Sequence, residues 1–394
     1  MQTHRILALN SGSSSLKFAL YEFSAAHELI LVRGEAENIG GQGGRLWLRG
    51  TEGELVANDA RPVPDSQAAL LAILDLLKKG NYPAPAAIGH RIVNGGPRYR
   101  TPQKITPQLL SDLRTFVSLA PLHLPTEIEV IEEVASRAPD IPQVACFDTG
   151  FHRNLPELAQ RFPLPRKFFE AGILRYGFHG LSYEYVLREL GRSAAHCRLI
   201  IAHLGNGASL AAVKDGLPVD TSMGLTPTGG IVMGTRSGDL DPGILIYLLR
   251  EKGYDAAALE RLVDAESGLL GVSELSSDMR ILLGRRASDS RADEAIAMFC
   301  RSVRKEIGAF AALLGGLDML VFTGGIGENA PAVRKEACHD LAHLGIQLDD
   351  ARNEAMEGTI SSGKGACVVR VVPTDEELMI ARHAHAVVFG DGRS

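Results

Sequence analysis

The sequence of 394 residues lacks any apolar run close to the roughly 18–20 residues that a membrane-crossing helix needs. Its first ten residues contain a short apolar stretch but no long apolar core followed by a small-residue cleavage site, so they do not read as a signal peptide. They are better explained as a first β-strand. These absences predict a cytoplasmic protein without a membrane partner.

Cysteine is scarce and scattered. Five are present, and no two form a C-x-x-C pair: Cys146, Cys197, Cys300, Cys338 and Cys367. This pattern argues against a disulfide framework and against a zinc site. It favours reduced thiols that pack as small buried hydrophobes.

An excess of positive charge is also missing, because the formal net charge is −6 at pH 7. This balance argues against nucleic acid and anionic membranes as partners. Hydrophobic residues make up 45% of the chain and charged residues 22%, which is typical of a globular protein. The length exceeds what one ordinary core organises and therefore predicts two domains.

The two best-known nucleotide motifs are absent. The chain contains no G-x-x-x-x-G-K-[ST] segment, which excludes a P-loop enzyme. Gly325-Ile-Gly327 is not followed by the third glycine of a dinucleotide fingerprint. Any nucleotide site must therefore be built in another way.

Glycine is abundant, with 42 residues, and it clusters after apolar, β-branched runs. Residues 5–10 and 16–21 read as strands around a small-residue turn, and residues 198–203 and 208–213 repeat this pattern half a chain later. Asp215-Gly216 then forms a hairpin turn. The repetition predicts a duplicated domain with a ligand held between the copies.

Other segments complete an α/β pattern. Apolar residues at helical spacing predict helices over 66–79, 126–136, 181–190 and 293–314, two of which stop at Gly80 and Gly315. A strand is expected over 317–323, and the glycine-rich segment 40–54 is expected to form a surface hairpin. The chain therefore alternates strands and helices without a long linker.

Three small-residue turns, at 10–15, 205–207 and 324–329, each follow a predicted strand. Turns without bulky side chains let backbone N–H groups approach phosphate oxygens. Such distributed turns around a duplicated hairpin core are typical of the actin, hexokinase and Hsp70 superfamily. The expected fold is α/β, with duplicated ribonuclease H-like domains and an interdomain cleft.

Four charged or titratable side chains stand out. Arg91 and Arg236 lie among glycines, where a guanidinium can come close to a carboxylate or phosphate. Asp148 follows the apolar run 142–147 and is placed to meet a metal ion or an arginine. His179 lies in Tyr176-Gly-Phe-His-Gly180. Surface ion pairs and a buried, hydrogen-bonded histidine remain the alternatives.

Nine motifs give a specific resemblance. They occupy residues 10–17 (Asn-Ser-Gly-Ser-Ser-Ser-Leu-Lys), 89–93, 147–152, 176–179, 203–207, 220–224, 233–242, 322–329 and 373–378. In this order they resemble the acetate and propionate kinase family, and they extend over almost the whole chain. The resemblance implies domains at 1–149, completed by about 383–394, and at 150–382.

The resemblance also implies a role for each matching residue. Asn10 and Glu376 would hold Mg²⁺ or Mn²⁺, and Asp148, Arg91, His179 and Arg236 would be catalytic. The ATP or ADP site would comprise Lys17, His203, Leu204, Gly205, Asn206, Gly207, Asp278, Met279, Arg280, Gly325, Ile326, Gly327, Glu328 and Asn329. The substrate carboxylate would bind Arg91, and its alkyl end would meet Val93, Leu122, Phe178 and Pro227.

The activity implied is reversible, Mg²⁺-dependent, in-line transfer of the ATP γ-phosphoryl group to acetate in a homodimeric enzyme. Several family positions differ. Asn94 follows Val93 where histidine is usual, Leu124 replaces an asparagine, Tyr183 replaces a histidine, and Thr228-Gly229-Gly230 replaces Leu-Glu-Gly. Some of these lie near the expected acyl pocket, so a propionate- or butyrate-type kinase remains an alternative. A sugar kinase and a non-catalytic ATP-binding clamp are the more distant ones.

Overall fold

The structure is a computed structural model that describes residues 3–12, 14–41 and 43–390. Ser13, in the first predicted turn, and Gln42, in the predicted hairpin segment, lie outside the described residues. The chain forms two compact units, one of residues 1–150 with 375–394 and the other of residues 151–374. The second boundary therefore differs from the expected 382/383, because helix α15 (Glu376–Phe389) packs as a whole against strands of the first unit.

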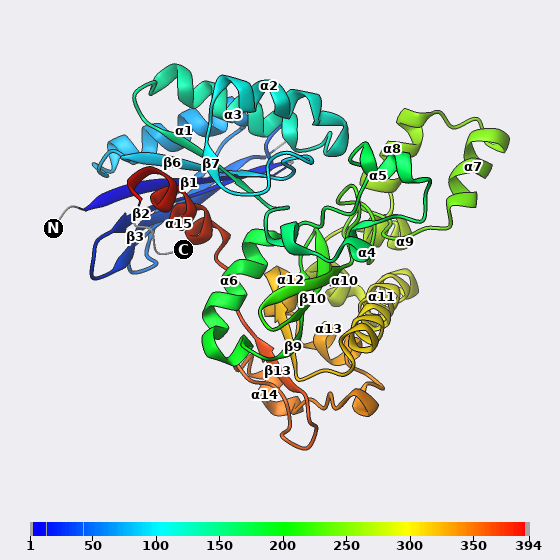
Figure 1. The fold of residues 1–394 in the computed structure, drawn as a ribbon. Helices are drawn as coiled ribbons and strands as arrows, with labels where there is room; N and C mark the ends of the chain where they lie inside the picture. Colours follow the sequence, from blue (N-terminus) through cyan, green and yellow to red (C-terminus); the bar gives the residue numbers. More distant parts are fainter. Residues whose placement is uncertain (1–2, 13, 42, 391–394) are drawn as a thin grey trace. The chain divides into compact units, whose positions relative to one another are not determined.

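The first unit contains an eight-stranded sheet in the order β5-β4-β3-β2-β1-β6-β8-β7. Its strands are β1 (His4–Ser11), β2 (Ser15–Phe23), β3 (Glu28–Glu37), β4 (Arg45–Gly50), β5 (Leu55–Ala60), β6 (Ala87–Ile92), β7 (Gln103–Lys104) and β8 (Gln143–Phe147). Helices α1 (Ser66–Lys79) and α3 (Leu124–Arg137) cover one face, α2 (Pro107–Thr115) packs on α3, and α15 covers the other face (Figure 1).

The second unit contains a five-stranded sheet in the order β11-β10-β9-β12-β13. Its strands are β9 (Arg198–Leu204), β10 (Ala208–Lys214), β11 (Leu217–Thr221), β12 (Met319–Thr323) and β13 (Val368–Val371). Helix α6 (Gly180–Leu190) packs its Tyr183 and Val186 against β9, and the long helix α11 (Ser290–Leu314) packs against β9 and β10.

The remaining helices are short or peripheral. They are α4 (Glu157–Gln160), α5 (Arg166–Glu170), α7 (Pro242–Glu251), α8 (Ala256–Ala265), α9 (Gly268–Ser273), α10 (Met279–Arg285), α12 (Gly324–Asn329), α13 (Pro331–Ala337) and α14 (Asp350–Glu354). Single 3₁₀ turns occupy Val117–Leu119, Phe151–Asn154, Gly191–Ala194 and Ala342–Leu344. Across the described residues, none of the helices is both long and apolar enough for a bilayer.

The two sheets share one topology. In each, an antiparallel three-stranded meander (β1-β2-β3 or β9-β10-β11) is extended beyond its first strand by two parallel strands, β6 and β8 or β12 and β13. This match confirms the predicted duplicated α/β fold of the actin and hexokinase type.

Most local predictions are confirmed, because the chemistry that starts and stops each helix lies next to it in the sequence. Asp65 accepts a hydrogen bond from the Ala68 N–H at the start of α1, and Gly315 ends α11 at φ +72°, where glycine is favoured. The segment 40–54 is only partly a surface hairpin. It contains β4, whose Leu46 and Leu48 are buried in the core. All five cysteines are buried, and none of them forms a disulfide.

Candidate functional site

Arg91 and Asp148 meet in the first unit. β6 and β8 are neighbouring parallel strands, so the residues at their carboxyl ends come together. Nε and Nη2 of Arg91 lie 2.8 and 2.5 Å from Oδ2 of Asp148, and Nη1 donates to the Ser11 carbonyl at 3.2 Å. The Asp148 side chain is 1% exposed and that of Arg91 12%. Burial lowers the pKa of Arg91, but Asp148, Glu376 and Glu127 together raise it by more than burial lowers it, so the guanidinium stays charged.

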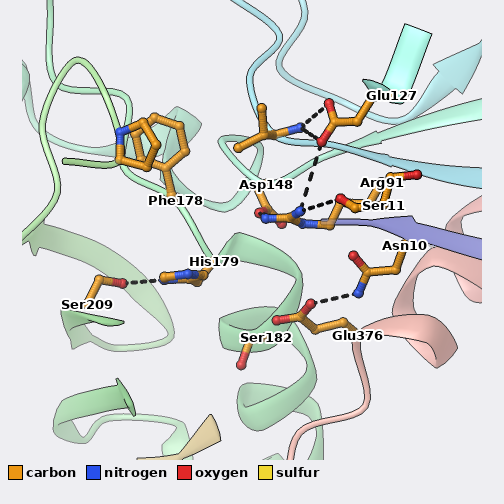
Figure 2. A network of polar contacts seen from close by, with 12 residues as sticks. Asn10, Ser11, Arg91, Glu127, Asp148, Phe178, His179, Ser182, Ser209 and Glu376 are labelled. Atoms are coloured by element: carbon orange, nitrogen blue, oxygen red, sulfur yellow. Dashed lines mark hydrogen bonds and ion pairs between the residues drawn. The ribbon is translucent and has the colours of Figure 1, made fainter. Parts of the chain in front are cut away.

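Asn10 and the start of α15 form a second polar group of the first unit (Figure 2). The Asn10 amide nitrogen donates to Glu376 at 3.0 Å and to Glu377 at 2.8 Å. These bonds occupy the nitrogen and leave the amide oxygen as an acceptor beside the Glu376 carboxylate. One amide oxygen and one carboxylate fit Mg²⁺, which usually keeps several water or phosphate ligands. No cluster of three or more acidic, histidine or cysteine ligands occurs among the described residues.

Lys17 lies opposite Asn10 in the β1–β2 pair. Desolvation lowers the pKa of Lys17, but Glu377, Glu35 and Glu376 together raise it by more, so the net shift is upward. The side chain is therefore a persistent cation next to Asn10 and α15. Two of the predicted acyl-pocket residues also belong to this unit. Val93 is 2% exposed just after β6, and Leu122 is 42% exposed just before α3.

His179 belongs to the second unit and immediately precedes α6. Its φ of +59° is uncommon for a residue other than glycine and fixes the direction of the side chain. Its Nδ1 lies 2.8 Å from the Ser209 hydroxyl, which in turn lies 2.5 Å from the Tyr183 hydroxyl (Figure 2 shows the first contact). His203 stacks on His179 at 4.3 Å and contacts the Ser182 hydroxyl at 2.8 Å. These contacts hold the His179 ring in place through Nδ1.

Arg236 approaches the same point. A Cβ built on Gly207 would lie 3.3 Å from Nε2 of His179 and 3.4 Å from Nη1 of Arg236. The two nitrogens therefore converge above a residue without a side chain. Arg236 Nη1 also donates to the Pro227 carbonyl at 3.2 Å, and Phe178 is buried next to His179 in the sequence. Convergent donors beside a glycine turn are suited to a multiply charged anion.

A pocket of about 550 Å³ lies in the second unit. Its walls include eight of the predicted nucleotide residues, from three segments: Gly205, Asn206, Asp278, Met279, Arg280, Gly325, Ile326 and Asn329. Ser277, Leu283 and Ala330 complete it. Apolar side chains and glycine backbone together suit a flat base carrying phosphates. Ser277 and Ala330 could have been found from the sequence, since each is adjacent to a predicted residue, whereas Leu283 is brought to the pocket by helix α10.

The other predicted nucleotide residues do not line this pocket. Leu204 is fully buried at the end of β9, and Gly327 is buried in α12. The Glu328 carboxylate accepts from the N–H groups of Gly324 at 2.9 Å and Thr374 at 3.0 Å. Glu328 therefore ties the β12–α12 turn to the last residue of the second unit.

Arg334 in α13 was not identified from the sequence. It is fully buried, and its guanidinium donates to the carbonyls of Gly327 and Glu328, both at 2.9 Å, and to the side chain and carbonyl of Asn353. Burial lowers its pKa. Arg334 therefore fixes α12, which carries one wall of the pocket. Its acceptors are two carbonyls of the preceding helix and Asn353, 19 residues further along the chain, and no sequence pattern marks such contacts.

We expect Arg334→Met to lower the free energy of unfolding by about 2–3 kcal/mol, because buried carbonyls would lose their donor. Urea unfolding followed by circular dichroism measures the change. Arg352→Met, which removes an exposed arginine with a 3.8 Å contact to Glu357, is the matched control and should cost less than about 1 kcal/mol. Equal losses for the two variants would contradict the structural role of Arg334.

Comparisons with known proteins agree over both units. The model of the acetokinase family matches residues 5–382. An acetate kinase from Rhodopseudomonas palustris is 44% identical over 398 aligned residues, which cover 98% of each chain. The crystal structure of Porphyromonas gingivalis acetate kinase has 39% identity and a TM-score of 0.85, covering 98% of this chain and 100% of that one. The crystal structure of a propionate kinase from Francisella tularensis has 37% identity and a TM-score of 0.90, and the match again covers 98% of this chain and 100% of that one.

Proposed function

The chain belongs to the acetokinase family, and from this premise we propose that it transfers the γ-phosphoryl group of ATP to acetate, giving acetyl phosphate and ADP. Propionate, or butyrate, is the alternative acceptor, since a propionate kinase is among the similar structures. The observation that supports a carboxylate acceptor most directly is Arg91. Its guanidinium is a largely buried, permanently charged fork at the end of β6, held in place by Asp148.

A carboxylate acceptor needs no general base, because its unperturbed pKa lies near 4–5 and it is ionised at neutral pH. Phosphoryl transfer spreads charge over three equatorial oxygens, so catalysis depends on positioning and electrostatic stabilisation. In the proposed mechanism Arg91 binds and orients the acid, and Asp148 orients Arg91. Arg236 and Nε2 of His179 donate to the transferring group.

Asn10 and Glu376 would hold Mg²⁺, which would neutralise charge on the nucleotide phosphates. The pocket beside Gly205 and Gly325 would hold the nucleotide. The acyl phosphate product transfers its phosphoryl group readily, so the reaction should also run toward ATP.

A hydroxamate assay tests the function. The enzyme is incubated with ATP, Mg²⁺, hydroxylamine and acetate, propionate or butyrate, and the acyl hydroxamate is measured. We expect the highest kcat/KM with acetate and overlap with propionate, because one methylene in an apolar pocket is worth only about 1–3 kcal/mol. No hydroxamate with any of the acids would reject the proposal. A higher kcat/KM with propionate would establish the alternative acceptor.

A homodimer is part of the proposal, and α7 supports it. Across the described residues of α7 no side chain is buried, although the helix reads Pro-Gly-Ile-Leu-Ile-Tyr-Leu-Leu-Arg-Glu. Its side chains Ile244, Ile246, Tyr247 and Leu249 are 43–52% exposed. A helix that is apolar on nearly every side is normally covered, and a second copy of the chain is the occupant we propose.

Light scattering after size exclusion should give twice the chain mass of 42.3 kDa for the wild type. The double variant Ile246→Glu with Tyr247→Glu should run as a monomer, because two charges would have to be buried. Leu158→Glu, at a leucine that is 89% exposed in α4, is the control and should remain dimeric. A monomeric wild type, or a dimeric double variant, would contradict this interface.

A further inference from the structure

Glu127 is a buried carboxyl group that the mechanism above does not use. It lies in the first turn of α3 and is only 2% exposed, on the same face as the buried Ile128 and Ile131. A glutamate on the apolar face of a helix is costly to bury unless its oxygens are satisfied. Its surroundings therefore indicate a specific role.

The Glu127 carboxyl group lies beside the substrate arginine and accepts a hydrogen bond from the backbone two residues after it (Figure 2). Its two oxygens lie 3.0 and 3.2 Å from the Val93 backbone nitrogen, and one of them lies 3.9 Å from Nη1 of Arg91. Val93 follows Ile92, the last residue of β6, so the strand no longer provides the acceptor for its N–H. Glu127 therefore fixes the chain where a predicted acyl-pocket residue follows the substrate arginine.

The charge of Glu127 matters because Arg91 already has one carboxylate partner, Asp148. Burial, with a smaller contribution from Asp148, raises the pKa of Glu127 to about 8 against the opposing effects of Arg91 and the Val93 N–H. A neutral carboxyl still accepts the Val93 hydrogen bond and adds no negative charge beside Arg91. An ionised Glu127 would add a second negative charge where an anionic acid is to bind.

Other charged groups of α3 face elsewhere. Gln67 of α1 donates a hydrogen bond to Glu133, and Arg114 of α2 binds Glu132. The charges that act on Glu127 come from Arg91 on β6 and Asp148 after β8.

We propose that Glu127 is a positioning residue for Arg91 and Val93: in its neutral form it holds the end of β6 ready for the substrate carboxylate, and its ionisation weakens substrate binding. The inference rests on the proposed function. Substrate affinity would therefore depend on pH through Glu127, and not through the groups that contact phosphate.

The test measures KM for acetate from pH 6.5 to 9.5 in the wild type and in Glu127→Gln. Glutamine keeps the shape and a carbonyl acceptor for Val93 but cannot ionise. We expect the wild-type KM to rise about tenfold between pH 7 and pH 9, since the neutral form falls to about one part in eleven one unit above a pKa of about 8. The KM of Glu127→Gln should stay nearly flat, and KM for ATP should not follow this trend in either protein.

Two controls make the result specific. Glu132→Gln removes a half-exposed carboxylate of the same helix and should keep the wild-type rise in KM. Glu127→Leu, which removes the acceptor for Val93, should raise KM at every pH if it folds. A flat wild-type KM, or a rise that persists in Glu127→Gln, would overturn the inference while leaving the function intact. Absence of acyl hydroxamate at every pH would instead reject the function itself.

A stability measurement gives a readout independent of activity. Because the folded pKa of Glu127 is raised above the unfolded value near 4.5, its contribution favours folding at low pH and is lost as pH rises toward about 8. Urea unfolding at pH 6 and pH 9 should therefore show a smaller loss of stability for Glu127→Gln than for the wild type. Equal losses in the two proteins would contradict the assigned titration.

Discussion

Replacing Arg236 by alanine is expected to lower kcat by about two to three orders of magnitude, or roughly 3–4 kcal/mol, while KM for acetate changes little. The guanidinium converges with Nε2 of His179 above Gly207, which has no side chain of its own at this point. A donor aimed at charge that develops in the transition state affects kcat, whereas a donor that only binds the ground state affects KM. The split between the two constants is therefore the informative measurement.

Steady-state kinetics with saturating ATP and varied acetate would measure both constants. Arg236→Lys should recover part of the activity, because it restores the charge without the planar fork. Arg188→Ala, at an exposed arginine of α6 in the same unit, should behave as the wild type. A normal kcat in Arg236→Ala would remove Arg236 from the proposed mechanism.

The elements of this fold that can be predicted are those whose start and end are determined by residues nearby in the sequence. The strand–turn–strand units are visible because apolar β-branched runs end at Asn10 and His203 in glycine- and serine-containing turns, and the two sheets repeat the same order around them. Helix α1 is visible because Asp65 and Gly80 bound its apolar face. The sequence placed Asp148 to meet a metal ion or an arginine, and the structure supplies Arg91 because neighbouring parallel strands bring their carboxyl ends together.

The unpredicted part consists of contacts that depend on how the elements pack. Arg334 looks like one of many surface arginines, yet it is buried and binds the carbonyls of α12 and Asn353 of α14. Tyr183 is known from the sequence only as a departure from the family, and its contact with Ser209 needs the packing of α6 on β10. Glu127 did carry a signal, an acidic residue within the apolar stripe of α3, but its partner Val93 depends on the tertiary fold.

Replacing Asp148 by asparagine is expected to reduce kcat/KM for acetate by about two to three orders of magnitude. Asparagine is nearly isosteric and keeps one acceptor for Arg91, but it leaves the guanidinium without its 2.5 Å counter-ion in a site from which water is largely excluded. Arg91 would then lose orientation, and both substrate binding and the chemical step would suffer. Asp75→Asn, which breaks an exposed ion pair with Lys79 in α1, is the control and should leave activity unchanged.

The pH profile decides how Asp148 acts. The acceptor carboxylate is already ionised, so an orienting Asp148 should add no carboxyl-like limb to the wild-type kcat profile, and Asp148→Asn should lower kcat by the same factor throughout. A proton-transferring Asp148 would produce such a limb, and the substitution would abolish it. If that limb disappeared in Asp148→Asn while Mg²⁺ affinity stayed unchanged, the orienting role would be wrong, and the contact with Arg91 would serve to set the acidity of Asp148 instead.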